Sequence, residues 1–382
     1  MFDGIVTKET ADEIERLRLA AEQGETWAQF RLGCIYCFGE GVPVVIDEAM
    51  RWYRLAAEQG HPGAQFRLGY AYECGEGVAK DCAEAVKWYQ KAAKQGEPGA
   101  QLRLGFAYDC GQGVPTDKAE AVKWYQKAAE QGDSVAQFWL GCAYECGEGV
   151  AKDCAEAVKW YQKAAEQGDP RAQRRLGYAY ELGRGAPMDK AEAVKWYQKA
   201  AAQGDLLAQF LLGRAYDSGE GVAKDCAEAV KWYQKAAEQG SADAQYNLAL
   251  SYFRGEGVLQ DFVEAYKWAN LAAAQNRNGS KELRDTLVQK MTPSQIQEGQ
   301  RLSSMKVSNA RNPQTRIGQE RQGRVAIPSD VRREVWRRDG GRCANCGSRE
   351  NLEYDLIIPL SRGGSNTARN IELLCEACNR SK

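Results

Sequence analysis

The sequence predicts an all-α protein: an α-solenoid of seven helix hairpins, each 36 residues long, followed by a small C-terminal module with a ββα arrangement. Two observations support this prediction. The dipeptide Ala-Gln recurs every 36 residues, beginning at Ala28, Ala64, Ala100, Ala136, Ala172, Ala208 and Ala244. Two Cys-x-x-Cys pairs follow the repeats, within the last 40 residues. We therefore expect a periodic array and a separate module.

Composition is ordinary, but charge is unevenly distributed. The 382 residues include 51 basic and 52 acidic side chains, as in a typical globular protein. Residues 306–382 carry 15 Lys and Arg against 9 Asp and Glu, whereas the preceding residues carry 36 against 43. The basic end indicates a polyanion partner. With no apolar signal segment and no apolar stretch of about 18 residues, the sequence is expected to be cytoplasmic.

Each repeat has the pattern of two helices joined by a glycine turn. The order is A-Q-x-x-L-G, a Tyr, Gly-x-Gly, and then D-x-x-E-A followed by Trp and usually Tyr. Ala85, Trp88, Tyr89 and Ala92 lie at i, i+3, i+4 and i+7, which places them on one helix face. Because one hairpin cannot bury this face alone, neighbouring hairpins are expected to share a continuous core.

These motifs resemble the Sel-one-like repeat family, a relative of the tetratricopeptide repeats, over about residues 10–275. The A-Q-x-x-L-G, Gly-x-Gly-Val and E-A-x-x-W-Y landmarks recur in order, and we assign residues 1–275 to the solenoid. The last copy departs most, with Ala249 in place of Gly and Ala269 in place of Tyr. The resemblance implies a scaffold that binds other proteins.

One position of the first helix differs between repeats and forms a mostly basic ladder. Its residues are Arg31, Arg67, Arg103, Trp139, Arg175, Leu211 and Asn247. Because one phase of a solenoid lies along one strip of its surface, the first five are candidates for binding an acidic or partly apolar segment of a partner protein. Alternatively, each arginine pairs with a carboxylate of a neighbouring repeat.

The residues after the last repeat predict a helical cap and a linker. Thr292, Pro293 and Gln295 supply the N-cap, the first-turn proline and the capping-box residue of a helix expected through about Leu302. We assign residues 276–304 to capping helices. Residues 305–325 lack apolar periodicity and are rich in Arg, Gln and Asn, which indicates a flexible basic linker.

The cysteines of the last segment, residues 326–382, predict a zinc site. Two Cys-x-x-Cys pairs are separated by 28 residues and consist of Cys343, Cys346, Cys375 and Cys378. Four thiolates at this spacing can surround one Zn²⁺ tetrahedrally, and a site closed by four protein ligands is structural. In a cytoplasmic protein such pairs are more typical of zinc than of disulfides.

The segment between the cysteine pairs predicts a strand at residues 352–359, a glycine-rich turn and return at 361–366, and a helix at about 367–379. The stretches W-R-R-D-G-G-R-C-A-N-C-G, D-L-I-I-P-L-S-R-G-G-S-N, N-I-E-L-L-C and C-N-R-S-K resemble the HNH endonuclease family over residues 328–382. The resemblance implies a ββα-metal fold and metal-dependent cleavage of DNA.

The family's site residues carry over onto this sequence with one exception. The resemblance implies that Asp355 and Asn379 bind a catalytic divalent metal, magnesium or manganese, and that Asn370 steadies the hairpin loop. The family's general-base histidine corresponds to Leu356, which has no lone pair with which to accept a proton. A general base contributes about 10²- to 10⁴-fold to the rate, so we expect this sequence to be inactive or severely weakened.

Two questions stay open at position 356. Glu353 shares a side of the predicted strand with Asp355 and is an alternative base. A deliberate knockout, a mutation selected during cloning of a toxic nuclease and a natural pseudo-enzyme are all compatible with leucine here.

Basic side chains around the module are consistent with binding to the phosphates of duplex DNA. The candidates are Arg337, Arg338, Arg342, Arg362, Arg369 and Arg380. Alternatively, these arginines belong to a solvent-exposed helix and bind no nucleic acid.

Two functions of different classes fit these features. The first is an HNH-type endonuclease whose repeats bind a protein, with a role in bacterial defence that the resemblance alone suggests. The second is a non-catalytic adaptor whose repeats bind protein and whose zinc module binds nucleic acid without cutting it. Leu356 favours the adaptor, whereas Asp355, Asn370 and Asn379 favour the enzyme.

Overall fold

The structure, a computed structural model, describes the backbone of residues 8–311, 352–356 and 371–375 and the side chains of residues 12–304. Two strands occur there, β1 (Leu352–Leu356) and β2 (Ile371–Cys375). The helices are α1 (Lys8–Glu22), α2 (Thr26–Phe38), α3 (Ile46–Glu58), α4 (Pro62–Cys74), α5 (Cys82–Lys94), α6 (Pro98–Cys110), α7 (Lys118–Glu130), α8 (Ser134–Cys146), α9 (Cys154–Glu166), α10 (Pro170–Leu182), α11 (Lys190–Ala202), α12 (Leu206–Ser218), α13 (Cys226–Glu238), α14 (Ala242–Arg254), α15 (Phe262–Ala274), α16 (Ser280–Val288) and α17 (Pro293–Arg311).

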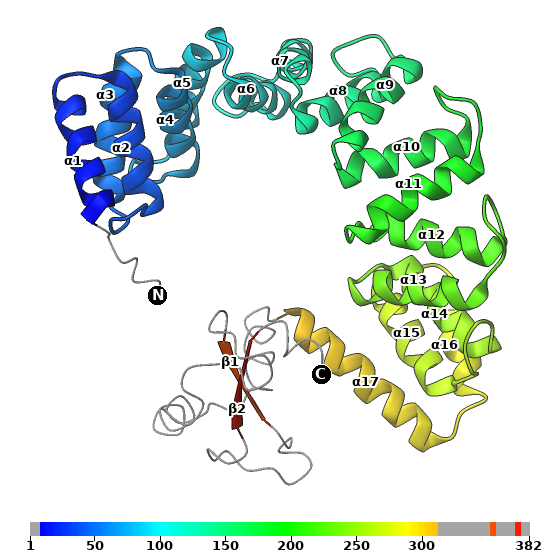
Figure 1. Cartoon of the computed structure of the whole chain (residues 1–382). Helices are drawn as coiled ribbons and strands as arrows, with labels where there is room; N and C mark the ends of the chain where they lie inside the picture. The colour runs from blue at the N-terminus through cyan, green and yellow to red at the C-terminus, as the bar shows by residue number, and fades with distance from the viewer. Residues whose placement is uncertain (1–7, 312–351, 357–370, 376–382) are drawn as a thin grey trace. The chain divides into compact units, whose positions relative to one another are not determined.

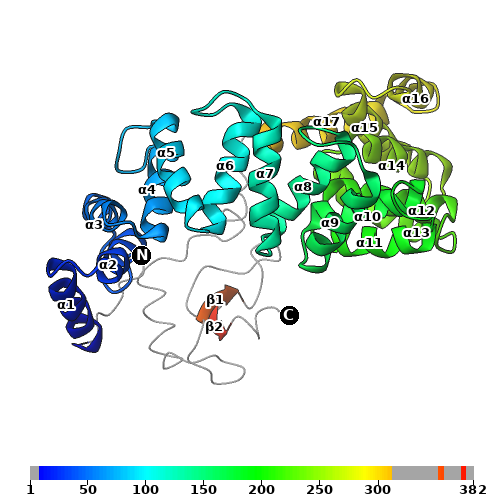
Figure 2. The ribbon, with the colours of Figure 1, turned by 90° about the horizontal axis from the view of Figure 1, so that it is seen from above.

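The seven predicted hairpins are confirmed. Each repeat contributes two helices of 13 residues, from the pair α2 and α3 to the pair α14 and α15. The helices of a pair pack against each other, and each pair packs against the next. Figures 1 and 2 show α1 to α16 following one another in sequence order. Within the described ranges, no helix combines the length and the apolar character needed to span a bilayer.

Side-chain caps and glycines set the ends of the repeat helices. In the fourth repeat, the Asp133 carboxylate accepts a hydrogen bond from the Ala136 amide (2.7 Å), and Asp153 does the same for Glu156 (3.0 Å). Helix α8 ends at Gly147, whose φ of 76° lies in the left-handed region that favours glycine. The D-x-x-E motif is therefore a helix start, and the first glycine of Gly-x-Gly is a helix end.

The second glycine of Gly-x-Gly lets the turn contact the preceding repeat. A Cβ atom at Gly149 would overlap the backbone oxygen of Lys118, the first residue of α7, and one at Gly185 would overlap that of Cys154, the first residue of α9. Both glycines also have a positive φ. Any larger residue would push neighbouring repeats apart.

A tyrosine ring lies on a glycine in the core of each of the first six hairpins. In the fourth repeat, Tyr161 of α9 is buried against Gly141 of α8, where a Cβ would lie 2.6 Å from the ring carbon Cε1. In the seventh repeat the equivalent residues are Ala249 and Ala269, both buried. The two replacements in the last repeat therefore match each other. The methyl group of Ala249 fits because Ala269 presents no tyrosine ring to it.

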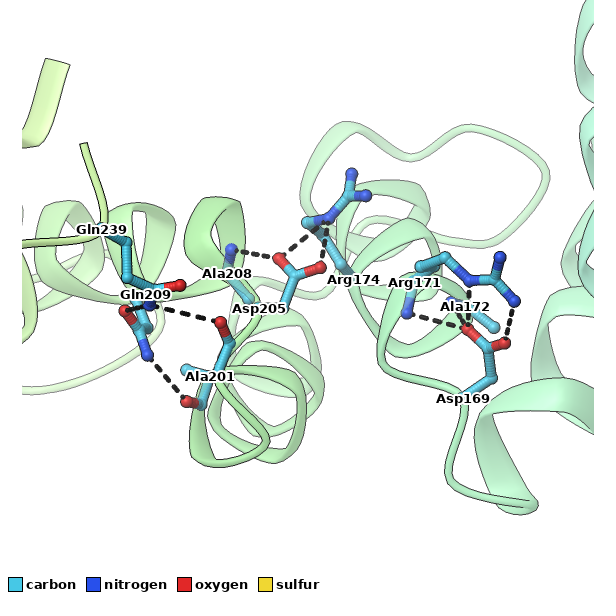
Figure 3. Close-up of polar contacts among 10 residues, drawn as sticks. Asp169, Arg171, Ala172, Arg174, Ala201, Asp205, Ala208, Gln209 and Gln239 are labelled. Atoms are coloured by element: carbon cyan, nitrogen blue, oxygen red, sulfur yellow. Dashed lines mark hydrogen bonds and ion pairs between the residues drawn. The ribbon is translucent and has the colours of Figure 1, made fainter. Parts of the chain in front are cut away.

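Buried glutamines connect neighbouring repeats along the array. The Nε2 group of Gln209 donates to the backbone oxygen of Ala201 in the preceding repeat (3.2 Å), and its Oε1 accepts from Nε2 of Gln239 (2.8 Å; Figure 3). Equivalent bonds occur in every repeat and involve the buried residues Gln29, Gln65, Gln101, Gln137, Gln173, Gln209 and Gln245. The Ala-Gln dipeptide recurs because this amide links three helices.

The substitution Gln209→Met is expected to lower the free energy of unfolding by about 1–3 kcal/mol, because it removes two hydrogen bonds of a buried amide, to the Ala201 carbonyl and from Gln239, at nearly unchanged side-chain volume. Urea unfolding followed by circular dichroism measures the loss. The control is Gln234→Met, since Gln234 is exposed and its amide donates to the Glu238 carboxylate within the same helix (3.1 Å). Equal losses in the two variants would contradict the bridging role of Gln209.

The array is followed by two helices that belong to different units. The chain divides into Met1–Thr292 and Pro293–Lys382. Helix α16 packs against α15 at the end of the first unit. Helix α17 begins at Pro293 as expected, but the predicted end near Leu302 is wrong, because the helix continues to Arg311. Residues 305–311 of the expected linker are therefore helical, and the first proline or glycine after Leu302 is Pro313.

In the second unit, β1 and β2 form an antiparallel pair, with Leu352 opposite Cys375 and Leu356 opposite Ile371. The helix expected over residues 367–379 is therefore wrong across residues 371–375. A lone five-residue strand would leave its backbone hydrogen-bonding groups unpaired, and the short glycine-rich turn could not supply a partner strand. The I-E-L-L-C segment supplies it.

Candidate functional site

The arginines of the ladder mostly turn toward partners within the array. Nη1 of Arg103 lies 3.1 Å from a carboxylate oxygen of Glu73, and Nη1 of Arg175 lies 3.7 Å from Glu145, in each case in the preceding repeat. Arg31 pairs with Glu40 of its own repeat (2.7 Å). The intramolecular pairing that the sequence left open is therefore present at these positions.

The remaining ladder positions are not equivalent to one another. The Arg67 guanidinium lies 5.0 Å from the centre of the Phe38 ring. Trp139 is half-buried and meets the rings of Phe106 and Phe138 edge-on, and Leu211 is only 2% exposed. Burial at Leu211 interrupts the ladder, so it is not a continuous basic strip on the surface.

The carboxylates that pair with Arg103 and Arg175 also accept hydrogen bonds from the core tyrosines. The Tyr161 hydroxyl donates to Glu145 (2.6 Å), and the Tyr89 hydroxyl donates to Glu73 (2.5 Å). Burial raises the pKa of Tyr161 well above its usual range, so the hydroxyl stays protonated and acts as a donor. This network fixes the Glu145 carboxylate at the surface between the fourth and fifth repeats.

A cavity of about 340 Å³ opens beside Glu145 and Arg175. Arg174, Arg184 and Tyr178 also line it, together with apolar residues of α9, α10 and α12. The Nε group of Arg174 lies 3.0 Å from the carboxylate of Asp205, which caps α12 through the Ala208 amide (2.8 Å; Figure 3).

Two other arginine features distinguish this cavity. The Nε atom of Arg175 is buried without a hydrogen-bond partner. Arg184 is exposed, and in the described part of the chain its guanidinium forms no ion pair or hydrogen bond. Arg175 and Arg184 therefore each have N–H groups without a hydrogen-bond acceptor in the described part of the chain. Arg174 and Arg184 are not among the residues predicted from the sequence, although they differ from the residues at the same positions of the other six repeats.

The structure places few of the residues predicted for the C-terminal module. Asp355 and Leu356 are the last two residues of β1, opposite Glu372 and Ile371, and Cys375 is the last residue of β2. The other predicted residues lie outside the described ranges: Cys343, Cys346, Cys378, Asn370, Asn379, Arg337, Arg338, Arg342, Arg362, Arg369 and Arg380. Among the described residues, no cluster of His, Cys, Asp or Glu could hold a metal ion.

Family models match both parts of the chain. The Sel1 repeat model matches residues 28–61, 62–97, 98–133, 134–169, 170–205, 206–241 and 242–276. The HNH endonuclease model matches residues 343–382. The first model follows the hairpins one by one, and the second includes all four cysteines of the predicted zinc site.

Solved structures are similar to the repeat part. A Sel1 repeat protein from Oxalobacter formigenes is 39% identical, with a TM-score of 0.59, and the match covers 75% of this chain and 83% of that one. The protective antigen c5321 of uropathogenic Escherichia coli, described as displaying an SLR fold, is 30% identical over 79% of this chain and 89% of its own, with a TM-score of 0.45. No curated protein matches the sequence.

Proposed function

Because the chain belongs to the Sel1 repeat family and carries a C-terminal HNH endonuclease domain, we propose that it is a metal-dependent DNA endonuclease whose repeats bind a partner protein. The reaction is hydrolysis of a phosphodiester bond in duplex DNA. The observation that carries the proposal is the HNH match over residues 343–382, which includes Asp355 and the four cysteines.

The donor atoms of the C-terminal module fit two kinds of metal. The thiolates of Cys343, Cys346, Cys375 and Cys378 suit a structural zinc. The carboxylate of Asp355 and the amide oxygen of Asn379 are oxygen donors of the kind that magnesium and manganese prefer. When bound, the divalent metal supplies stabilisation of the charge that develops on the scissile phosphate and the departing 3′ oxygen. Asn370 steadies the loop between the ligands.

Leu356 removes one step from this scheme. An attacking water needs a group that accepts its proton, and a leucine side chain has none. The only histidine of the chain, His61, is engaged in the second repeat, where its Nδ1 caps α4 by accepting from the Ala64 amide (3.2 Å). Its ring stacks on Phe30, and burial lowers its pKa. The proposal is therefore that this sequence is a severely weakened nuclease.

A non-catalytic adaptor is the second candidate, and Leu356 is the observation that favours it. In this version the repeats bind protein and the zinc module binds nucleic acid without cutting it. Recovery of cleavage in the Leu356→His variant separates the two candidates. The proposal also includes a cytoplasmic location, which the nine free cysteines of the repeats support because unpaired thiols are typical of a reducing compartment, and a role in bacterial defence against foreign DNA.

The full-length protein is expected to contain about one zinc per chain, and the double variant Cys346→Ser/Cys378→Ser is expected to lose it, because each pair loses a thiolate. Metal analysis by mass spectrometry measures the content. The control is Cys110→Ser/Cys146→Ser, which removes two exposed free cysteines of the repeats. Zinc that persists in the first variant, or disappears in the control, would contradict the assignment.

A further inference from the structure

The cavity beside Glu145 recurs in equivalent form at two other repeat interfaces, but it is much larger here. Residues shifted by 36 or 72 positions line cavities of about 10 Å³ beside Glu181 and about 20 Å³ beside Glu73. The cavity between the fourth and fifth repeats measures about 340 Å³, which lies in the range of small ligand pockets. The repeat geometry is the same, so the difference arises from the side chains.

Two side chains found only in the fifth repeat line the enlarged cavity. Arg174 occupies the position that holds an apolar or aromatic side chain in the other repeats, namely Phe30, Phe66, Leu102, Phe138, Phe210 and Tyr246. Arg184 occupies a position that is otherwise Glu40, Glu76, Gln112, Glu148, Glu220 and Glu256. The ion pair between Arg174 and Asp205 draws the first side chain toward α12, and the space of an aromatic ring stays open.

Charge also distinguishes the enlarged cavity. Three arginines and one glutamate line it, a net charge of +2, whereas charges balance in the cavities beside Glu73 and Glu181. Asp205 neutralises Arg174, and Glu145 is shared between Arg175 and Tyr161. The guanidinium of Arg184 and that of Arg175, whose side chain is 40% exposed and whose Nη1 lies 3.7 Å from Glu145, are the donors that a bound anion would meet.

The cavity has an apolar edge beside its cationic groups. Leu182 and Leu207 line it and are 49% and 44% exposed. We propose that this cavity binds an acidic peptide segment of a partner protein, with a carboxylate on Arg175 and Arg184 and an adjacent apolar side chain on Leu182 and Leu207. The inference rests on the protein-binding role proposed for the repeats and assigns that role to one site.

Two other occupants are disfavoured by charge. The chain's own C-terminal part, residues 306–382, is basic and would be repelled by the arginines. Nucleic acid would meet a repeat region in which acidic side chains outnumber basic ones, 43 to 36 over residues 1–305, and a cavity that contains Glu145. An isolated carboxylate next to an apolar group matches the site better than a polyanion does.

The test is selection of random seven-residue peptides, displayed on phage, against the full-length protein. Enriched peptides are expected to carry Asp or Glu next to Leu, Ile or Phe. One such peptide, labelled with fluorescein, is then titrated by anisotropy. Binding is expected to weaken about tenfold or more with Arg174→Phe/Arg184→Glu, because charge-assisted hydrogen bonds are lost. Both replacements restore residues that other repeats carry, so the fold tolerates them.

Controls separate this site from general effects of charge. The variant Gln112→Glu adds a negative charge at the same repeat position in the third repeat, and it is expected to bind the peptide as the wild type does. The single variant Arg184→Glu, at an exposed position, tests the anion contact without filling the cavity. A peptide with Asn or Gln in place of its acidic residue is expected to bind the wild type weakly.

Three outcomes would overturn the inference: enriched peptides without acidic residues, equal peptide affinity of the wild type and the two cavity variants, or displacement of the peptide by duplex DNA. The last outcome would identify nucleic acid as the ligand. Zinc content and DNA cleavage are measured without the peptide, so failure here leaves the proposed nuclease testable by itself.

Discussion

Histidine in place of Leu356 is expected to raise cleavage of duplex DNA by about 10²- to 10⁴-fold in the presence of Mg²⁺ or Mn²⁺. The resemblance to HNH endonucleases leaves this position as the single departure, since Asp355, Asn370 and Asn379 are present. Proton abstraction from water is then the missing step. Conversion of supercoiled plasmid to nicked and linear forms by the full-length Leu356→His variant measures the gain.

Matched variants distinguish restored catalysis from a general effect of a polar residue. Leu356→Gln is polar but not basic and is expected to stay inactive. Asp355→Ala added to Leu356→His is expected to abolish cleavage, because the divalent metal loses its carboxylate ligand. If Leu356→His binds DNA but remains inert, both alone and with a protein bound to the repeats, the adaptor is the correct function.

The repeat fold could be predicted from the sequence because its signals are local and occur seven times. Glycine turns, aspartate caps and the spacing of Ala85, Tyr89 and Ala92 each determine short-range structure. The helix predicted over Ile371–Cys375 is wrong for the opposite reason. A five-residue apolar run fits either a helix or a strand, and only its pairing with β1 decides.

The candidate site was harder to predict because it depends on where long side chains point. The repeat phase correctly places Arg103 and Arg175 on one helix face, but periodicity does not reveal that Glu73 and Glu145 hold them. The cavity depends on the ion pair of Arg174 with a cap residue 31 positions away. Comparison of the copies would have singled out Arg174 and Arg184, but not the open space between them.

The contact between Gly141 and Tyr161 is expected to be the most sensitive point of a hairpin. Tyr161→Ala is expected to cost about 3–5 kcal/mol, as other large-to-small substitutions of buried aromatic residues do. Gly141→Ala is expected to cost about 1–3 kcal/mol, because its Cβ would lie 2.6 Å from the tyrosine ring. Urea unfolding and hydrogen exchange in α8 and α9 measure these losses repeat by repeat.

The double variant Gly141→Ala/Tyr161→Ala is expected to lose less stability than the sum of the two single variants, by about 0.5–3 kcal/mol. The methyl group introduced by Gly141→Ala would enter space that the ring has left. The seventh repeat already carries this combination, since Ala249 and Ala269 are both fully buried there. Strictly additive losses would contradict this explanation. They would show that Gly141 is needed for the close packing of the two helices and not to make space for the Tyr161 ring.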